Sequence, residues 1–189
     1  MIFVISGPSG SGKTTLRDNL LQDGAFKGRL VKSVSLTTRT PRSGERQGRD
    51  YCFVSNAEFA KQKRAKKILE WTRYLGYYYA TAKEYLKRQI SRGKNVVLCV
   101  DANGVRAVKR LYPESSVSIF VAPPSLAALK HRITGRCHKT TCKEINQRLR
   151  LAKNELASAG KYDYRIVNRD LGRSVEQLKK IVDRHIKRK

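Results

Sequence analysis

The feature that most constrains this sequence is a glycine-rich loop near its start, Gly7-Pro8-Ser9-Gly10-Ser11-Gly12-Lys13-Thr14. The loop matches the phosphate-binding pattern G-x4-G-K-[S/T] at every fixed position. It follows an apolar run at residues 2–6, and leucines at 16, 20 and 21 recur after it at helical spacing. A loop between a strand and a helix in this way points backbone N–H groups at an anion. We therefore expect the chain to bind the phosphates of a nucleoside triphosphate.

Individual residues of this loop have separate expected roles. The glycines let the backbone approach phosphate oxygens closely and adopt conformations that a Cβ would forbid. Lys13 is expected against the β and γ phosphates, and Thr14 is expected to offer its hydroxyl to Mg²⁺. The helix that continues from Thr15 adds the positive end of its dipole.

The rest of the chain predicts an α/β fold. Short β-branched or apolar runs alternate with helix-like segments, which is typical of a parallel sheet flanked by helices. The predicted strands are residues 2–6, 95–100, 116–122 and 164–168, and amphipathic helices are predicted at 144–157 and 175–186. Two long stretches, 33–83 and 135–143, fit neither pattern and are expected to be insertions that handle ligands.

Composition limits the class of protein. A chain of 189 residues can bury one good core, so one compact domain is expected. No stretch approaches the roughly 18 to 20 apolar residues of a membrane span. The four cysteines are too scattered for a secreted disulfide framework, which favours the reducing cytoplasm.

The formal net charge of +26 is extreme and leaves two alternatives open. Basic residues could solvate the exterior and serve an anionic substrate, or part of the surface could contact nucleic acid. The 41 lysines and arginines are spread along the chain without an aromatic-rich RNA-binding signature, so charge alone does not decide.

A second phosphate site is predicted downstream of the loop. Arg39 and Arg42 lie three apart on a segment stiffened by Pro41, so they can grip one phosphate from two sides. The hydroxyls of Tyr51 and Tyr79 can add donors, which makes the site suitable for a phosphomonoester.

Two carboxylates suggest which base accompanies that phosphate. Glu70 and Asp101 can each accept two N–H groups from a base edge, and guanine offers an adjacent ring N–H and exocyclic amine. Such a pocket would prefer guanine over adenine.

Five segments together resemble the guanylate kinase family, in its order and spacing across nearly the whole chain. They are the glycine-rich loop, residues 33–51, Leu69-Glu70-Trp71, residues 76–81 and Ala122-Pro123-Pro124-Ser125. The resemblance implies ATP-dependent phosphorylation of GMP to GDP, with dGMP as an open alternative substrate. It also implies three parts: a P-loop core at 1–32, 83–125 and 157–189, a GMP-binding insertion at 33–82, and a lid at 126–156.

The resemblance assigns site residues one by one. The implied ligands of the GMP phosphate are Arg39, Arg42, Tyr51 and Tyr79, and the implied guanine readers are Ser35, Glu70, Thr81 and Asp101. Arg132, Arg136 and Arg148 match the lid arginines that close over the ATP phosphates, and Asn168 matches a position near the adenine.

One departure from the family stands beside the expected Mg²⁺ position. Cys99 occupies a place where the family usually has an acidic residue. With the surface charge, this keeps a basic, RNA- or ribosome-docked relative open as an alternative. A phosphopeptide-binding scaffold of the same fold is the other alternative, although such scaffolds commonly lose the lysine that Lys13 supplies here.

Overall fold

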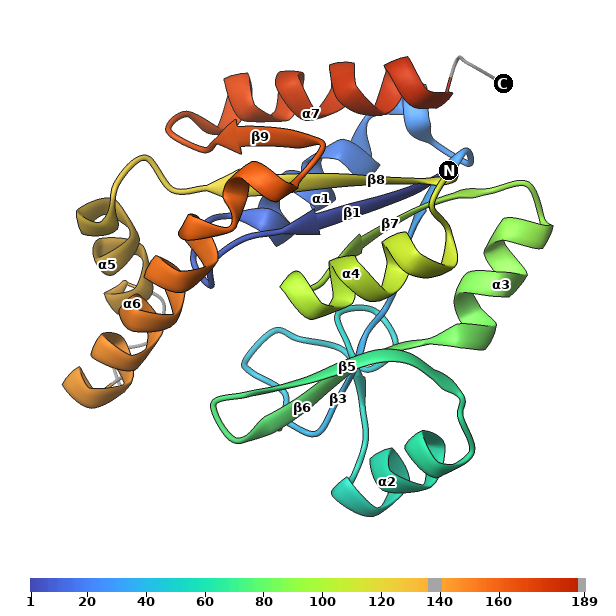
Figure 1. Cartoon of the computed structure of the whole chain (residues 1–189), viewed down its shortest axis with the longest axis horizontal. Coiled ribbons are helices and arrows are strands. Elements are labelled where there is room, and N and C mark those ends of the chain that lie inside the picture. Colours follow the sequence, from blue (N-terminus) through green and yellow to red (C-terminus); the bar gives the residue numbers. More distant parts are fainter. Residues whose placement is uncertain (136–140, 187–189) are drawn as a thin grey trace.

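The computed structural model describes residues 1–135 and 141–186. At its centre is a five-stranded parallel sheet with the order β2-β7-β1-β8-β9 (Figure 1). The strands are β1 (Ile2–Ser6), β2 (Leu30–Lys32), β7 (Asn95–Cys99), β8 (Ser116–Ala122) and β9 (Tyr164–Val167). The predicted α/β fold with a parallel sheet is confirmed. Of the five strands of this sheet, β2 was not predicted, because three residues are too few to show a pattern.

Helices cover both faces of this sheet. On one face, Phe3 and Ile5 of β1 pack with apolar residues of α1 (Lys13–Gln22) and α7 (Leu171–Ile186). On the other face, Ile2 and Val4 pack with residues of α3 (Lys83–Ser91) and α4 (Ala102–Leu111). Because both faces are buried, the central strands are apolar without alternation, as parallel strands usually are.

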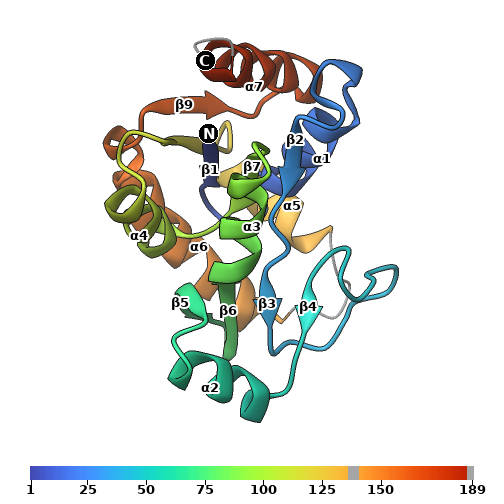
Figure 2. The same ribbon diagram turned by 90° about the vertical axis from the view of Figure 1, so that its right-hand side faces the viewer.

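A second, four-stranded sheet with the order β4-β3-β6-β5 lies at one end of the main sheet (Figure 2). Its strands are β3 (Leu36–Thr37), β4 (Cys52–Phe53), β5 (Ile68–Tyr74) and β6 (Tyr77–Ala82), and α2 (Asn56–Arg64) packs on it. The sheet has a small core of its own around Leu36, Phe59, Ile68 and Ala80. These elements, which we call the insertion, fall within residues 33–82.

The remaining helices are α5 (Leu126–Thr134) and α6 (Cys142–Ala157), which project beyond the sheet as a pair (Figure 1). Leu129 and Ile133 of α5 pack against Ile145 and Ala152 of α6. Two short 3₁₀ turns, η1 (Gly24–Phe26) and η2 (Ala159–Lys161), complete the described elements. Among the described helices, none combines the length and apolar character that crossing a bilayer requires.

Candidate functional site

The candidate site forms at the carboxyl edge of the main sheet. Parallel strands all end at the same edge, so the loops that follow them meet there. The P-loop follows β1, Cys99 and Asp101 lie at the end of β7, and Asn168 follows β9. The sheet therefore brings together residues more than 150 positions apart, since Asn168 bonds to Ser11 across 157 positions.

The P-loop has the backbone that its glycines permit. Gly7, Gly10 and Gly12 have φ angles of 135°, 91° and 96°, which residues with a Cβ rarely adopt. The Lys13 ammonium donates to the carbonyl oxygens of Gly7 at 2.5 Å and Pro8 at 2.8 Å. The predicted order of strand, loop and helix is therefore present, with α1 beginning at Lys13.

Two of these glycines also allow close packing. A Cβ on Gly7 would lie 2.2 Å from the Val121 carbonyl oxygen of β8, and a Cβ on Gly12 would lie 2.2 Å from the side-chain nitrogen of Asn168. Both distances are far below van der Waals contact. The loop is thus held directly against the neighbouring strands.

Asn168 is buried and connects the P-loop to α5. Its side-chain Nδ2 donates to the Ser11 carbonyl oxygen at 2.8 Å. Its own carbonyl oxygen accepts from Arg132 Nη2 at 2.9 Å. Asn168 therefore fixes the position of the P-loop backbone at Ser11, a role that the sequence did not predict for it.

The other predicted triphosphate ligands lie on the loop and the first turn of α1. Ser9 and Thr14 are half-buried, whereas Thr15 is exposed. The Pro8 carbonyl faces Lys13, and Ser11 is buried.

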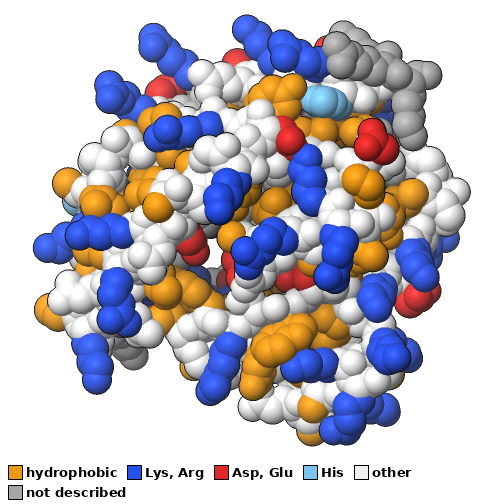
Figure 3. All heavy atoms as spheres, in the orientation of Figure 1, with side chains coloured by type: hydrophobic (Ala, Val, Ile, Leu, Met, Phe, Trp, Pro, Cys, Tyr) orange, Lys and Arg blue, Asp and Glu red, His pale blue; other side chains and the backbone are white. Residues whose placement is uncertain are grey.

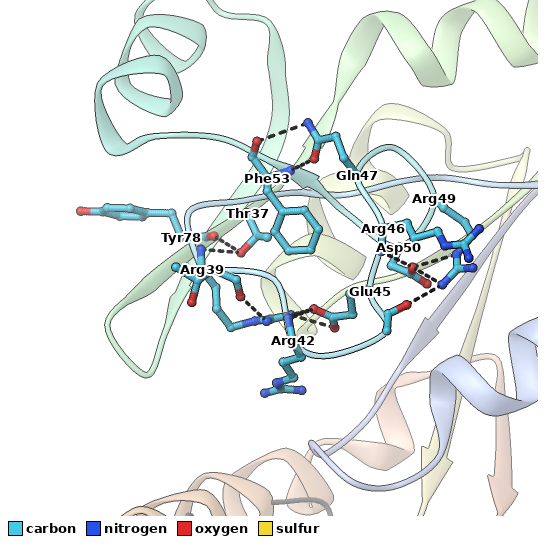
Figure 4. Close-up of polar contacts among 12 residues, drawn as sticks. Thr37, Arg39, Arg42, Glu45, Arg46, Gln47, Arg49, Asp50, Phe53 and Tyr78 are labelled. Atoms are coloured by element: carbon cyan, nitrogen blue, oxygen red, sulfur yellow. Dashed lines mark hydrogen bonds and ion pairs between the residues drawn. The ribbon is translucent and has the colours of Figure 1, made fainter.

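The predicted second phosphate site, which would hold the phosphate that accepts the transferred group, contains the buried Arg39. This arginine forms an ion pair with a carboxylate of the same segment (Figure 4). Arg39 Nη2 donates to both carboxylate oxygens of Glu45 at 3.0 and 2.9 Å, and Nη1 donates to the Thr40 carbonyl. Burial lowers the pKa of Arg39, but Glu45 and Tyr79 together more than offset this effect, so the net shift of the pKa is upward. Sequence reasoning missed Glu45, because its pairing with Arg39 depends on how the loop between them folds back.

Arg42 behaves differently from Arg39. Its backbone N–H donates to Glu45 at 2.8 Å, and its side chain extends away from the Arg39–Glu45 pair (Figure 4). Arg42 is exposed. The segment thus holds one arginine in place and leaves the other able to swing toward an anion.

The two predicted tyrosines lie beside Arg39. The Arg39 guanidinium carbon is 5.5 Å from the centre of the Tyr51 ring, and the Tyr51 and Tyr79 rings meet edge to face at 6.0 Å. Burial raises the pKa of Tyr51, so its hydroxyl stays a donor at neutral pH. Three of the four predicted phosphate ligands are therefore in one cluster, and we call Arg39, Tyr51 and Tyr79 the acceptor cluster.

Three of the four predicted guanine readers, Glu70, Thr81 and Asp101, come together. Thr81 donates its hydroxyl to Glu70 at 2.6 Å across the β5–β6 pair, and both residues are buried. Burial, together with the nearby charge of Asp101, raises the pKa of Glu70 to about 7. Asp101 caps α4 by accepting from the Gly104 N–H at 2.9 Å. Ser35 is half-buried, and its carbonyl accepts from the Cys52 N–H.

The α5–α6 pair supplies further charged groups. Arg148 forms an ion pair with Glu144 one turn earlier on α6. Tyr74 of the insertion interacts electrostatically with Arg148 and Glu155, and lies close to Ser9 of the P-loop. The core, the insertion and the α5–α6 pair therefore meet at this point.

Glu155 is a second acidic residue that sequence reasoning missed. Burial raises the pKa of its carboxyl, while Lys13 acts in the opposite direction. It therefore lies in the electrostatic reach of the P-loop lysine. The predicted Arg136 lies outside the described residues.

Comparison with known proteins agrees with this geometry. The guanylate kinase family model matches residues 1–185.

This chain belongs to the guanylate kinase family.

Guanylate kinases from bacteria are similar over nearly the full chain. That of Wolbachia sp. subsp. Brugia malayi is 38% identical, covering 97% of this chain and 92% of its own. That of Bacillus anthracis is 41% identical, covering 96% and 87%. The crystal structure of guanylate kinase from Anaplasma phagocytophilum has 31% identity and a TM-score of 0.79, covering 97% of this chain and 84% of that one. The family resemblance found in the sequence, and with it guanylate kinase activity, is confirmed.

The close packing of Gly7 leads to a prediction. Gly7→Ala should lower the free energy of unfolding by about 2 kcal/mol or more, because its Cβ would clash with Val121 and its φ is strained for alanine. Chemical denaturation measures the change.

Gly160→Ala is the matched control. Apart from its neighbours in the chain, no atom of the described residues lies within 4 Å of its added Cβ, so a change within about 0.5 kcal/mol is expected. Equal stabilities of the two variants would contradict the packing of the P-loop described above.

Proposed function

We propose that this guanylate kinase transfers the γ-phosphoryl group of ATP to GMP through the residues described above, giving ADP and GDP. One observation carries the assignment of residues. Tyr51 of the acceptor cluster lies within electrostatic range of Arg17 on α1 and of Cys99 at the end of β7. This proximity of the acceptor cluster to the P-loop side of the sheet supports a two-nucleotide site.

On the donor side, we assign ATP to the P-loop. Backbone N–H groups of the loop would hold the phosphates, and Lys13 would bind the β and γ phosphates. Asn168 supports this site through Ser11. The proposed ATP ligands are Gly7, Pro8, Ser9, Gly10, Ser11, Gly12, Lys13, Thr14, Thr15 and Asn168.

The donor set near Lys13 fits Mg²⁺, and we propose Thr14 as its protein ligand. Mg²⁺ prefers oxygen and typically takes one or two protein ligands, completing its shell with substrate phosphates and water. A half-buried hydroxyl beside the phosphate loop meets that need, and within the described residues no cluster of three or more metal-binding side chains competes. When bound, the ion neutralises phosphate charge.

On the acceptor side, we assign the GMP phosphate to Arg39, Arg42, Tyr51 and Tyr79. We assign the base to Ser35, Glu70, Thr81 and Asp101. An ionised Glu70 can accept two N–H groups of guanine. Arg39 keeps its place through Glu45, so phosphate binding costs little side-chain ordering.

Transfer requires positioning and charge neutralisation rather than a general base. A phosphate oxygen of GMP is already anionic and can attack in line. We propose that Arg132 of α5, Arg148 of α6 and Arg136, which lies outside the described residues, offset charge on the transferring group. Closure of this pair and of the insertion would exclude water that otherwise hydrolyses ATP.

The division into parts follows from these roles. We propose a P-loop core at 1–32, 83–125 and 157–189, a GMP-binding insertion at 33–82 and a lid at 126–156. The separate core of the insertion supports this division. We also propose a cytoplasmic location, supported by the free thiols of Cys52, Cys99 and Cys142.

Replacing the P-loop lysine tests the proposed donor side. Lys13→Ala should lower GMP-dependent ADP production at least about 100-fold while changing GMP affinity little, because Lys13 acts on ATP phosphates. A coupled assay with ATP, Mg²⁺ and GMP gives the rate, with AMP as the control substrate, and calorimetry gives the affinity. Equal loss of GMP binding would refute this division of roles, and wild type without GMP-dependent turnover would refute the function.

The raised pKa of Glu70 predicts pH-dependent GMP binding. With a pKa of about 7, the carboxyl is mostly protonated at pH 6 and mostly ionised at pH 8, and only the ionised form accepts two N–H groups. Wild type should therefore gain up to about tenfold in GMP affinity relative to Glu70→Gln as pH rises from 6 to 8.

Calorimetric titration of both proteins at each pH measures this ratio. The GMP phosphate also titrates in this range, but it does so equally with either protein. A ratio that stays constant with pH would contradict the proposed role of Glu70.

Nucleic-acid contact through the basic surface is a separate proposal. Figure 3 shows the face of the molecule that is seen in Figure 1, and lysine and arginine side chains are spread over it with few acidic ones between them. Binding to RNA should then weaken steeply as salt rises, because each phosphate contact releases counterions. Fluorescence anisotropy with a labelled RNA from 50 to 200 mM salt measures this, and weak binding even at low salt would refute it.

A further inference from the structure

Helix α1 carries a buried arginine close to the P-loop. Arg17 lies one turn beyond Lys13, on the same side of the helix, and only 8% of its surface is exposed. Arginines are rarely this buried unless an anion accompanies them. The ionic partner within the structure is Asp18, whose Oδ1 accepts from Arg17 Nε at 2.9 Å and Nη2 at 2.8 Å. The Asp18 side chain is 47% exposed, so this pair lies at the solvent boundary.

The surroundings of Arg17 include both halves of the site. Its guanidinium lies within electrostatic range of Cys99, at the end of β7, and of Tyr51 of the acceptor cluster. Cys99 also interacts electrostatically with Lys13. Arg17 therefore lies one turn from the P-loop lysine and within electrostatic range of the tyrosine assigned to the GMP phosphate.

The charge balance there favours an anionic ligand. Burial raises the pKa of the Cys99 thiol, so Cys99 is neutral at physiological pH and supplies no counter-charge. Asp18 compensates Arg17 from one side only, and Lys13 adds a second cation nearby. A planar guanidinium with several donors is well suited to a phosphate in this setting.

We propose that Arg17 is a further phosphate-binding residue of this active site, contacting the GMP phosphate beside Tyr51. The inference rests on the proposed function and deepens it. Arg17 would neutralise part of the repulsion between the GMP phosphate and the incoming γ-phosphoryl group. The neutral Cys99 is part of the arrangement, because a carboxylate at that position would pair with Arg17 and remove its charge from the substrate.

Substitution of Arg17 is the direct test. Arg17→Gln should weaken GMP affinity about 10- to 100-fold, as expected for loss of a charged hydrogen bond, while ATP affinity changes less than about threefold. Arg17→Lys should recover part of the loss because it restores the charge. Arg110→Gln, the same change on the exposed surface of α4, should match wild type. Calorimetry gives both affinities, and chemical denaturation verifies folding.

Variants of Cys99 test the proposed role of Arg17 independently, in case Arg17→Gln fails to fold. Cys99→Asp should weaken GMP binding to a similar degree by pairing with Arg17, whereas the neutral Cys99→Ser should not. Unchanged GMP affinity in folded Arg17→Gln, or Cys99→Asp that binds GMP as tightly as Cys99→Ser, would overturn the inference. If the wild-type protein still forms GDP in that case, only the role of Arg17 is refuted and the proposed function is retained. If the wild-type protein forms no GDP, both the proposed function and the role of Arg17 are refuted.

Discussion

The candidate site depends on the parallel hydrogen bonding of β7, β1, β8 and β9. This pairing places the ends of four strands at one edge, where the segments that follow β1, β7 and β9 supply site residues. The loop after β1 is pressed so closely against β8 that Gly7 has no room for a Cβ. Had one of these strands run antiparallel, its functional end would lie at the opposite edge of the sheet. The shared direction of the strands thus determines which residues can meet at the site.

The sequence predicted the central elements well because their patterns are local. The strands β1 and β8 have the predicted bounds, since a continuous apolar run needs no knowledge of its neighbours. The short β2 could not be found in this way, because it is recognisable only from its pairing with β7. The C-terminal helix was predicted from its apolar stripe, which begins at Val175, although the helix itself begins at Leu171.

The site was predicted as a set of residues but not as a set of contacts. Arg39, Tyr51 and Tyr79 do lie together, as their residue types suggested. Their assigned roles in GMP binding remain predictions. The pairing of Arg39 with Glu45 and the burial of Arg17 were not foreseen, because charge partners depend on how a loop folds back or on which face a helix buries. Cys99 was recognised as unusual, yet only the structure reveals the guanidinium beside it.

Asn168 provides a physical connection between the P-loop and the α5–α6 pair. One residue bonds to the P-loop through its side chain and to α5 through its carbonyl. The bond to α5 runs through Arg132, so the placement of the helix pair and the shape of the loop share an intermediary. When two events share one contact, any coupling between them acts equally in both directions. A change at the P-loop that altered the bond between Ser11 and Asn168 would therefore act on the segment that holds Arg132 of α5, and a movement of α5 would act on the loop in the same way.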